Sequence, residues 1–254
     1  MQGISRNRRT RLDQLLVDRD LASSKAEAQR LILAGEVELV GAGSRTLKPG
    51  QLVATDAQLT LVERPRWASR GGLKLIAALD AWRIDPSGLA CLDAGASTGG
   101  FTDVLLDRGA RIVYAVDVGR GQLVDRLRRD PRVVSMERTN LRTLESLPEP
   151  VDLATLDLSF IGLSLVLPAV HRLLREGGRV VALVKPQFEA GREDVPRGGV
   201  VRDPSVHQRV LDDLARDAPD AGFEMLHWIT SPVTGGDGNV EFLAELRRDS
   251  GDAT

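Results

Sequence analysis

From residue 69 onward, short apolar runs alternate with segments in which apolar residues recur every three or four positions. A short apolar run bounded by turn residues predicts a buried strand, and the three-to-four spacing predicts one face of a helix. The expected strands cover residues 89–93, 112–117, 133–136, 153–158, 179–185, 223–230 and 240–246. The expected helices cover residues 99–109, 121–129, 163–175 and 204–217, after a leading helix that contains Leu73, Ile76, Ala77 and Leu79.

This alternation predicts an α/β fold with a seven-stranded, mainly parallel, doubly wound sheet, because helical crossovers connect parallel strands. Only a short glycine-rich turn separates the last two strands, so we expect them to form an antiparallel hairpin at the sheet edge. The carboxyl ends of the parallel strands then share one edge, where sheets of this kind bind their ligands.

The first 62 residues have a different pattern and predict a small α+β domain. Apolar residues on one face predict a helix within residues 9–17. Ser23 or Ser24 can cap a second helix, with Glu27 completing a capping box and Gly35 ending the helix. We expect the domain to finish with a small hairpin sheet of two short strands, 37–40 and 51–54.

The sequence Glu-Arg-Pro-Arg-Trp-Ala at residues 63–68 interrupts both patterns and predicts a linker. The expected domains are therefore residues 1–62 and 69–254. Residues 1–79 carry 13 Lys+Arg and 8 Asp+Glu, a net charge of +5, whereas the rest carries 21 and 28, a net charge of −7, and together these give −2. A basic front part on an acidic body indicates that the front part meets a polyanion, although a solvated charged face would look the same.

The composition is that of a globular protein, with 42% hydrophobic and 28% charged residues. No apolar run approaches the roughly 18 residues that span a bilayer. The basic N-terminus has no apolar segment behind it, and Cys91 is the single cysteine of the chain. We therefore expect a cytoplasmic protein without an internal disulfide and without a membrane partner.

Lysine is rare in this chain, which has four lysines and thirty arginines. An arginine keeps its proton near neutral pH, whereas a desolvated lysine can lose it. Lysines that persist in such a composition are candidates for chemistry, or they are ordinary surface residues. Two of them lie in the expected α/β domain. Lys74 is in the leading helix, and Lys185 is the last residue of the expected strand 179–185.

A turn of small residues, 94–100, follows the first strand of the expected sheet and leads into a helix. Its sequence fits neither the dinucleotide fingerprint nor the phosphate-binding loop, and it offers no lysine to a phosphate. Asp93 before this turn suits a positively charged amino group, and Asp117 at the end of the second strand suits a ribose diol. Both acids favour S-adenosylmethionine as cofactor; a tight glycine turn without any ligand is the alternative. Asp157 and Lys185 end the next strands and should face the same cleft.

With these motifs in view, the chain closely resembles the TlyA (haemolysin A) family of rRNA 2′-O-methyltransferases, over nearly its whole length. The front part looks like the alpha-L RNA-binding fold through Arg11-Leu12-Asp13, Ser24-Lys25-Ala26-Glu27-Ala28 and Gly35-Glu36-Val37. The body is similar to FtsJ-like methyltransferases through four motifs: Ser69-Arg70-Gly71-Gly72-Leu73-Lys74, Asp93-Ala94-Gly95-Ala96-Ser97-Thr98-Gly99-Gly100-Phe101, Lys185-Pro186-Gln187-Phe188-Glu189 and Gly238-Asn239-Val240-Glu241-Phe242.

The resemblance implies a Rossmann-like class I methyltransferase sheet and a catalytic tetrad made of Lys74, Asp157, Lys185 and Glu241. A ribose 2′-hydroxyl is a poor nucleophile until its proton leaves, so a nearby base is needed. We expect Lys185 to accept or steer that proton, Asp157 to hold the lysines and approach the cofactor, and Glu241 to orient Lys74 or the ribose.

The resemblance also implies sites for the cofactor and for ribosomal RNA, with cytidine as the modified nucleoside. The expected cofactor residues are Asp93, Gly95, Ala96, Ser97, Thr98, Gly99, Gly100, Phe101, Asp117, Val118, Asn140 and Asp157. Asn140 would contact the adenine, or it is a turn asparagine. The expected RNA contacts, made to backbone phosphates, are Arg6, Arg8, Arg9, Arg11, Lys25 and Arg30.

Two other functions stay open at this point. A non-catalytic ribosome-assembly factor would have lost a tetrad residue or the turn, and a membrane-active cytolysin would need a strongly amphipathic or membrane-spanning segment. Neither is seen in the sequence. His171, His207 and His227 have no second ligand at a metal-type spacing, so we expect no metal site, and the large ribosomal substrates favour a monomer. The glycine-rich stretch 190–202 is either a loop over the active site or disordered.

Overall fold

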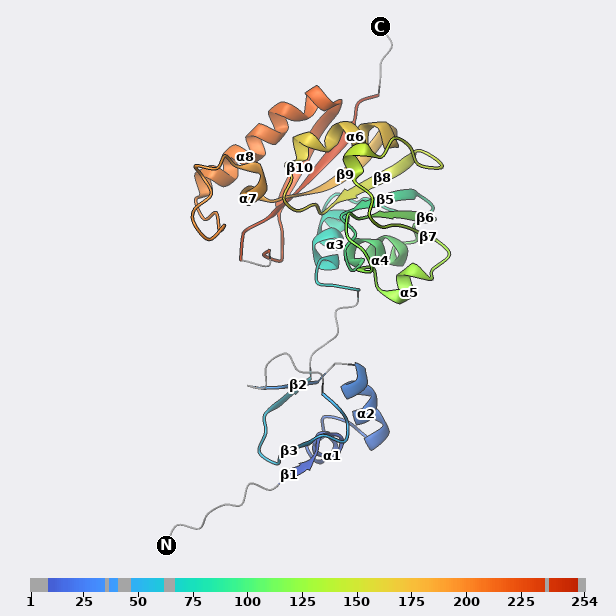
Figure 1. The fold of residues 1–254 in the computed structure, drawn as a ribbon, viewed down its shortest axis with the longest axis vertical. Coiled ribbons are helices and arrows are strands. Elements are labelled where there is room, and N and C mark those ends of the chain that lie inside the picture. The colour runs from blue at the N-terminus through green and yellow to red at the C-terminus, as the bar shows by residue number, and fades with distance from the viewer. Residues whose placement is uncertain (1–8, 35–36, 41–46, 62–66, 236–237, 251–254) are drawn as a thin grey trace. The chain divides into compact units, whose positions relative to one another are not determined.

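The computed structural model describes residues 9–34, 37–40, 47–61, 67–235 and 238–250. The chain divides into two compact units, Met1–Arg66 and Trp67–Thr254 (Figure 1). The division falls within the expected linker, most of which lies outside the described residues.

The first unit is built from two helices and four three-residue strands. In chain order these are β1 (Arg9–Arg11), α1 (Leu12–Asp18), α2 (Lys25–Ala34), β2 (Val37–Leu39), β3 (Leu52–Ala54) and β4 (Leu59–Leu61). The two helices bury one apolar face each, with Leu12, Leu16 and Ala28 fully buried. The burial of these side chains supplies the core of this small unit.

The predicted hairpin between residues 37–40 and 51–54 is wrong. Instead, β3 pairs with β1 and β2 pairs with β4, each pair antiparallel. The sequence misled because β1 is Arg-Thr-Arg, which has no apolar face, and because a three-residue strand such as β4 is too short to give a clear alternation. For the same reason the first helix begins at Leu12 rather than at Arg9.

The predicted capping box of the second helix is confirmed. The Ser24 hydroxyl accepts the backbone N–H of Glu27 at 3.2 Å, and the Glu27 carboxylate accepts the backbone N–H of Ser23 at 2.7 Å. These reciprocal bonds satisfy donors that a helix N-terminus otherwise leaves free. Gly35, the predicted end of this helix, lies outside the described residues.

The second unit contains a seven-stranded sheet in the order β10-β11-β9-β8-β5-β6-β7. The five strands β5 to β9 run parallel to one another, and β11 is antiparallel to both β9 and β10. The predicted α/β fold with a final antiparallel hairpin is thereby confirmed. The strands are β5 (Ala90–Ala94), β6 (Ile112–Val116), β7 (Val133–Met136), β8 (Val151–Leu156), β9 (Leu174–Val184), β10 (Phe223–Thr230) and β11 (Phe242–Arg248).

Helices cover both faces of this sheet (Figure 1). One face carries α3 (Gly72–Ala81), α4 (Gly100–Asp107) and α5 (Asp125–Arg128), and the other carries α6 (Leu167–Leu173), α7 (Pro186–Glu189) and α8 (Pro204–Asp217). Successive residues of a strand point to opposite faces. Cys91 therefore packs with the α3–α4 side and Leu92 with the α6–α8 side, and both are fully buried. This two-sided burial explains why the strands have apolar runs rather than alternation.

The glycine-rich stretch 190–202 is an irregular loop whose end is fastened to the sheet. The buried Asn239 accepts the backbone N–H of Val201 at 2.9 Å and donates to the carbonyl of Gly199 at 2.9 Å. Asn239 lies two residues before Glu241, so the loop is hydrogen-bonded to the segment that carries the predicted catalytic glutamate.

Candidate active site

The register of the sheet brings four of the predicted acids and lysines to one edge. Ala94 pairs with Val116 on one side and with Leu156 on the other, so the residues that follow these strands, Asp117 and Asp157, flank the turn after β5. On the far side of β8, the antiparallel pair Phe242–Val184 places Glu241 opposite Lys185. The strand ends alone predicted the convergence of Asp157 and Lys185, whereas Glu241 was expected here only from the family resemblance.

The turn after β5 requires glycine at residue 95. Gly95 has φ +84°, and a Cβ placed on it would lie 2.3 Å from the carbonyl oxygen of Asp157. Its N–H donates to the carbonyl of Val116 at 2.8 Å. A side chain here would clash with backbone as well as strain the conformation. The backbone N–H of Asp157 donates to the carbonyl of Ala94 at 2.9 Å, and the absence of a side chain at Gly95 leaves room for this approach.

The Ser69–Lys74 motif lies directly against the N-terminus of α4. A Cβ on Gly100 would lie 2.3 Å from the Ser69 hydroxyl. One residue earlier, the backbone N–H of Ala68 donates to the Asp103 carboxylate at 2.7 Å, and Asp103 is also paired with Arg126. Sequence reasoning missed Asp103, because an acid in the first turn of a helix is an ordinary solvent-facing choice.

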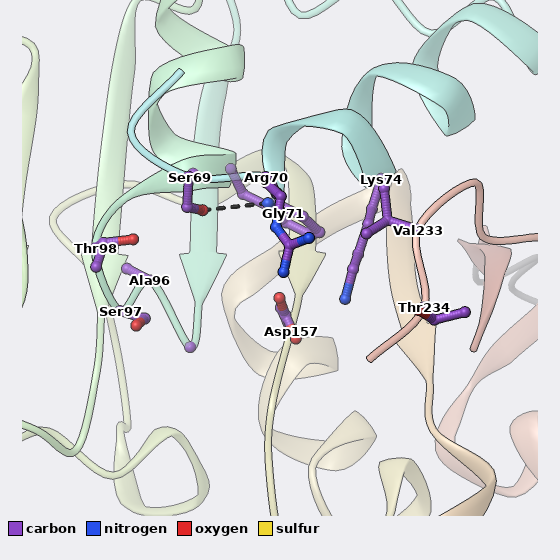
Figure 2. Close-up of a pocket in the computed structure, with 13 residues that line it drawn as sticks. Ser69, Arg70, Gly71, Lys74, Ala96, Ser97, Thr98, Asp157, Val233 and Thr234 are labelled. Carbon is purple, nitrogen blue, oxygen red and sulfur yellow. Dashed lines mark hydrogen bonds between the residues drawn. The ribbon is translucent and has the colours of Figure 1, made fainter. Parts of the chain in front are cut away.

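Two cavities open at this edge and share Gly95, Ser97 and Asp157. The first has a volume of about 480 Å³ and the second about 470 Å³, each large enough for part of a nucleoside-sized ligand. The first is lined by Ser69, Arg70, Gly71, Lys74, Gly95, Ala96, Ser97, Thr98, Gly100, Phe101, Asp157, Val233 and Thr234 (Figure 2). The second is lined by Gly95, Ser97, Val116, Asp117, Val118, Gln122, Thr139, Asn140, Leu141, Asp157, Leu158, Ser159, Phe160, Ile161 and Val166.

Of the predicted cofactor residues, Asp93 and Gly99 line neither cavity. Asp93 is fully buried beneath the turn, where it accepts the hydroxyls of Thr102 at 2.6 Å and Thr155 at 3.3 Å. Burial raises the pKa of the Asp93 carboxyl to about 7, and the negative charge of Asp157 adds to this, while the Thr102 bond opposes it. Gly99 has φ +99° and caps α4. Both residues therefore contribute to the shape of the turn.

Asp117 and its neighbours form one wall of the second cavity. The Asp117 carboxylate accepts the backbone N–H groups of Ser97 at 2.8 Å and Gly119 at 2.6 Å, which fixes its direction. Val118, 73% exposed, adds an apolar surface. Asn140 lines the same cavity, and its side-chain oxygen accepts the backbone N–H of Arg142 at 3.0 Å. Asn140 therefore has both features that the sequence analysis treated as alternatives: it stabilises a turn and it lines the cavity.

The four predicted tetrad residues form two ion pairs. Lys74 Nζ lies 2.5 Å from Glu241 Oε2, and Lys185 Nζ lies 2.6 Å from Asp157 Oδ1. Lys74, Lys185 and Glu241 are all buried, at 8%, 7% and 3% exposure, so neither pair is an ordinary surface contact. Figure 2 shows Lys74 and Asp157 pointing into the first cavity from opposite sides. Lys74 and Asp157 line this cavity, and Glu241 and Lys185 lie behind them as their ion-pair partners.

Several residues that line the cavities were not predicted, among them Arg70, Ser159 and Phe160. Arg70 points into the first cavity above Asp157 in Figure 2, and its place in the Ser69–Lys74 motif could have revealed it. Ser159 accepts from Lys185 Nζ at 3.3 Å. Phe160 is 89% exposed and has φ +64°, which is a strained conformation for a side chain of this size. No sequence pattern gave a signal for Ser159 or Phe160, because they lie in a connection between elements.

The predicted RNA-binding residues differ in what the structure says of them. Arg9 and Lys25 are exposed, whereas Arg11 makes two bonds to the buried Asp13, at 3.0 and 2.7 Å. The Arg11 bond holds the pKa of the Asp13 carboxyl well below its usual range, which indicates a structural pair. Arg6, Arg8 and the side chain of Arg30 lie outside the described part of the chain.

The comparisons with known proteins agree with this geometry. A family model described as FtsJ-like methyltransferase matches residues 67–248, the part of the chain that forms the sheet and both cavities. The Mycobacterium tuberculosis protein named 16S/23S rRNA (cytidine-2′-O)-methyltransferase TlyA is 48% identical over 244 residues, 94% of this chain and 90% of that protein. The chain belongs to the TlyA family of FtsJ-like methyltransferases.

Two further TlyA-family comparisons cover almost the whole chain. Hemolysin A from Brachyspira hyodysenteriae is 39% identical and covers 93% of this chain and 99% of its own length. A solved structure from Streptococcus thermophilus is 45% identical, with a TM-score of 0.73 over 96% of this chain and 90% of that one. In the described residues of this TlyA-family chain, we find no helix with the length and apolar character to cross a bilayer.

Proposed function

We propose that the chain transfers a methyl group from S-adenosylmethionine to the 2′-hydroxyl of cytidine in ribosomal RNA. The observation that carries this proposal is the pair of lysine–carboxylate bridges at the edge where two cavities meet. The M. tuberculosis relative, whose name gives this reaction, matches both units of the chain at 48% identity, which supports the same substrate class. Because that name includes both 16S and 23S rRNA, we propose both ribosomal subunits as substrates.

The second cavity fits the adenosine part of S-adenosylmethionine. Asp117, fixed by two backbone N–H groups, has free lone pairs for a ribose diol, and Val118 and Asn140 offer an apolar face and an amide to the adenine. Asp157 lies where the two cavities join and presents a negative charge to that point. When bound, S-adenosylmethionine supplies a methyl group on a positively charged sulfur.

We propose that Lys74 and Asp157, which line the first cavity, and their partners Glu241 and Lys185 then prepare the nucleophile. Lys185 orients the 2′-hydroxyl and, as a neutral amine, takes its proton as the new O–C bond forms, which is general base catalysis. This step requires that the Lys185 ammonium first passes its own proton to Asp157 or to solvent. Asp157 holds the Lys185 nitrogen at 2.6 Å, and Glu241 holds Lys74 at 2.5 Å. Since methyl transfer is a direct displacement, most of the rate comes from holding the reacting atoms in line.

The proposed reaction differs in one measurable product from a non-catalytic ribosome-assembly factor, the alternative that the sequence alone left open. We would incubate the protein with labelled S-adenosylmethionine and purified 30S or 50S subunits from cells lacking the modification. Digestion of the rRNA to nucleosides should place the label in 2′-O-methylcytidine from both subunits. Label in a base-methylated nucleoside would contradict the proposed reaction, and no transfer with intact subunit binding would favour the assembly factor.

A further inference from the structure

The segment that follows Asp157 carries the strained Phe160 and lines the second cavity, yet it belongs to no long element. Its first tie to the neighbouring β9–α7 turn is the 3.3 Å bond from Lys185 Nζ to the Ser159 hydroxyl. Its second is the packing of the Phe160 ring on the Phe188 ring, with centroids 5.0 Å apart. Both ties come from the Lys185–Glu189 motif.

The third tie is the side chain of Glu189, to which the proposed reaction assigns no role. Both of its carboxylate oxygens accept the backbone N–H of Leu163, at 3.0 and 3.1 Å. A Cβ on Gly162 would lie 3.3 Å from the same carboxylate and 3.7 Å from the carbonyl oxygen of Phe188, so the backbone at residue 162 lies close to α7. Burial raises the pKa of the Glu189 carboxyl to about 7, and the Leu163 bond opposes this.

A partly buried carboxylate facing a single backbone N–H is a costly way to close a turn. The position of Glu189 on the turn that also carries Lys185 gives a reason for this cost. Lys185, Phe188 and Glu189 are spaced three and four residues apart, so they fall on one side of a single helical turn. That side faces residues 159–163, and a residue at positive φ such as Phe160 persists only where its surroundings hold it.

We propose that Glu189 is a positioning residue for methyl transfer. By accepting the hydrogen bond from the backbone N–H of Leu163, it fixes residues 158–163 against the turn that carries Lys185. This contact keeps the Asp157–Lys185 pair in a constant position relative to the cavity. The inference rests on the proposed function for its rate effect, but the tie itself can be measured without activity.

The test compares Glu189→Ala, Glu189→Gln and the control Leu214→Ala. Leu214 is buried on α8 and lines a small cavity together with Glu189, so its truncation loosens the same region without touching residues 158–163. Melting temperatures, kcat at saturating cofactor, KM for the subunits and amide hydrogen exchange of residues 158–163 are measured for each.

We expect Glu189→Ala to lower kcat by about tenfold or more with little change in KM, because small displacements of reacting groups are costly. Exchange in residues 158–163 should rise. Glu189→Gln should restore both, since an amide oxygen still accepts the Leu163 bond, and Leu214→Ala should lower the melting temperature but leave kcat within about twofold.

A kcat for Glu189→Ala within about twofold of the wild type would overturn the inference. So would an equal loss of kcat in Leu214→Ala, or a Glu189→Gln variant as slow as Glu189→Ala. If the wild-type protein itself fails to methylate either subunit, the proposed function is wrong, and unchanged hydrogen exchange in Glu189→Ala would then separately refute the tie.

Discussion

Asp93 is a fully buried acid whose carboxylate accepts the hydroxyls of Thr102 and Thr155. Its pKa rises from an ordinary 3.8 to about 7, chiefly because burial penalises the charged form. Between these two values the folded state binds more protons than the unfolded state. The contribution of Asp93 to stability is therefore present in acid and is lost as the pH rises through about 7.

The first prediction concerns Asp93→Asn. Without ligand, the wild-type protein should lose about 1 kcal/mol of unfolding free energy between pH 6 and pH 8 through this carboxyl. The variant should have a flatter dependence of melting temperature on pH, with part of the slope kept because the pKa of Glu189 is raised in the same way. The exposed Asp56→Asn serves as the control, and a slope in Asp93→Asn equal to the wild-type slope would refute the explanation.

The second prediction concerns the buried pair of Lys74 and Glu241. Removing one partner leaves the other charge buried without compensation, which costs about 3–5 kcal/mol. Lys74→Ala and Glu241→Ala should each destabilise strongly, and the double variant should cost much less than the sum. A double-mutant cycle in urea measures this coupling. Additive costs would mean that the two side chains do not form a pair in solution.

At the scale of elements, the turn between β5 and α4 forms the wall that the two cavities share. The sequence predicted the strands well, because strands buried on both faces are continuous apolar runs. It predicted that acids at strand ends converge, but not that Asp93 turns beneath the cavity toward Thr102 and Thr155. Side-chain direction at a strand end depends on the local turn, which the residue pattern does not contain. The pairing of the three-residue strands was not predicted, because strands this short show no clear alternation of apolar and polar residues.

The third prediction tests this turn with Gly95→Ala. The substitution adds both the strain of a positive φ and a clash with the Asp157 carbonyl. Gly88→Ala is the matched control, because Gly88 has φ +73° but open space around its Cβ position. Strain alone costs about 1–2 kcal/mol. Calorimetry should find S-adenosylmethionine binding lost in Gly95→Ala and kept in Gly88→Ala, and equal affinities would contradict the close approach.

At the scale of the whole molecule, the two units differ in charge and in proposed role: the first would bind RNA and the second would transfer the methyl group. The sequence anticipated both the division near residue 66 and the basic front part. Which basic residues are available was not predictable, since Arg11 proved to pair with a buried Asp13 two positions away. Exposed cations such as Arg9 and Lys25 remain the candidates for phosphate contacts.

The fourth prediction therefore compares Lys25→Glu with Arg216→Glu, an equal charge reversal on the exposed face of α8. Lys25→Glu should weaken binding to ribosomal subunits severalfold and reduce the slope of log affinity against log salt by about 1. Affinity for S-adenosylmethionine should not change. Equal effects of the two variants would indicate that net charge, rather than the first unit, governs binding.

The most direct test of the central claim is the single-turnover rate of methyl transfer to ribosomal subunits for Lys185→Ala. Lys48→Ala is the control, because Lys48 is an exposed member of the same small set of lysines. If Lys185 handles the proton of the 2′-hydroxyl, its loss should slow transfer by about 10²–10⁴-fold, while cofactor affinity stays within a few-fold and Lys48→Ala remains at the wild-type rate. A Lys185→Ala protein that methylates its subunits at the wild-type rate would contradict the account.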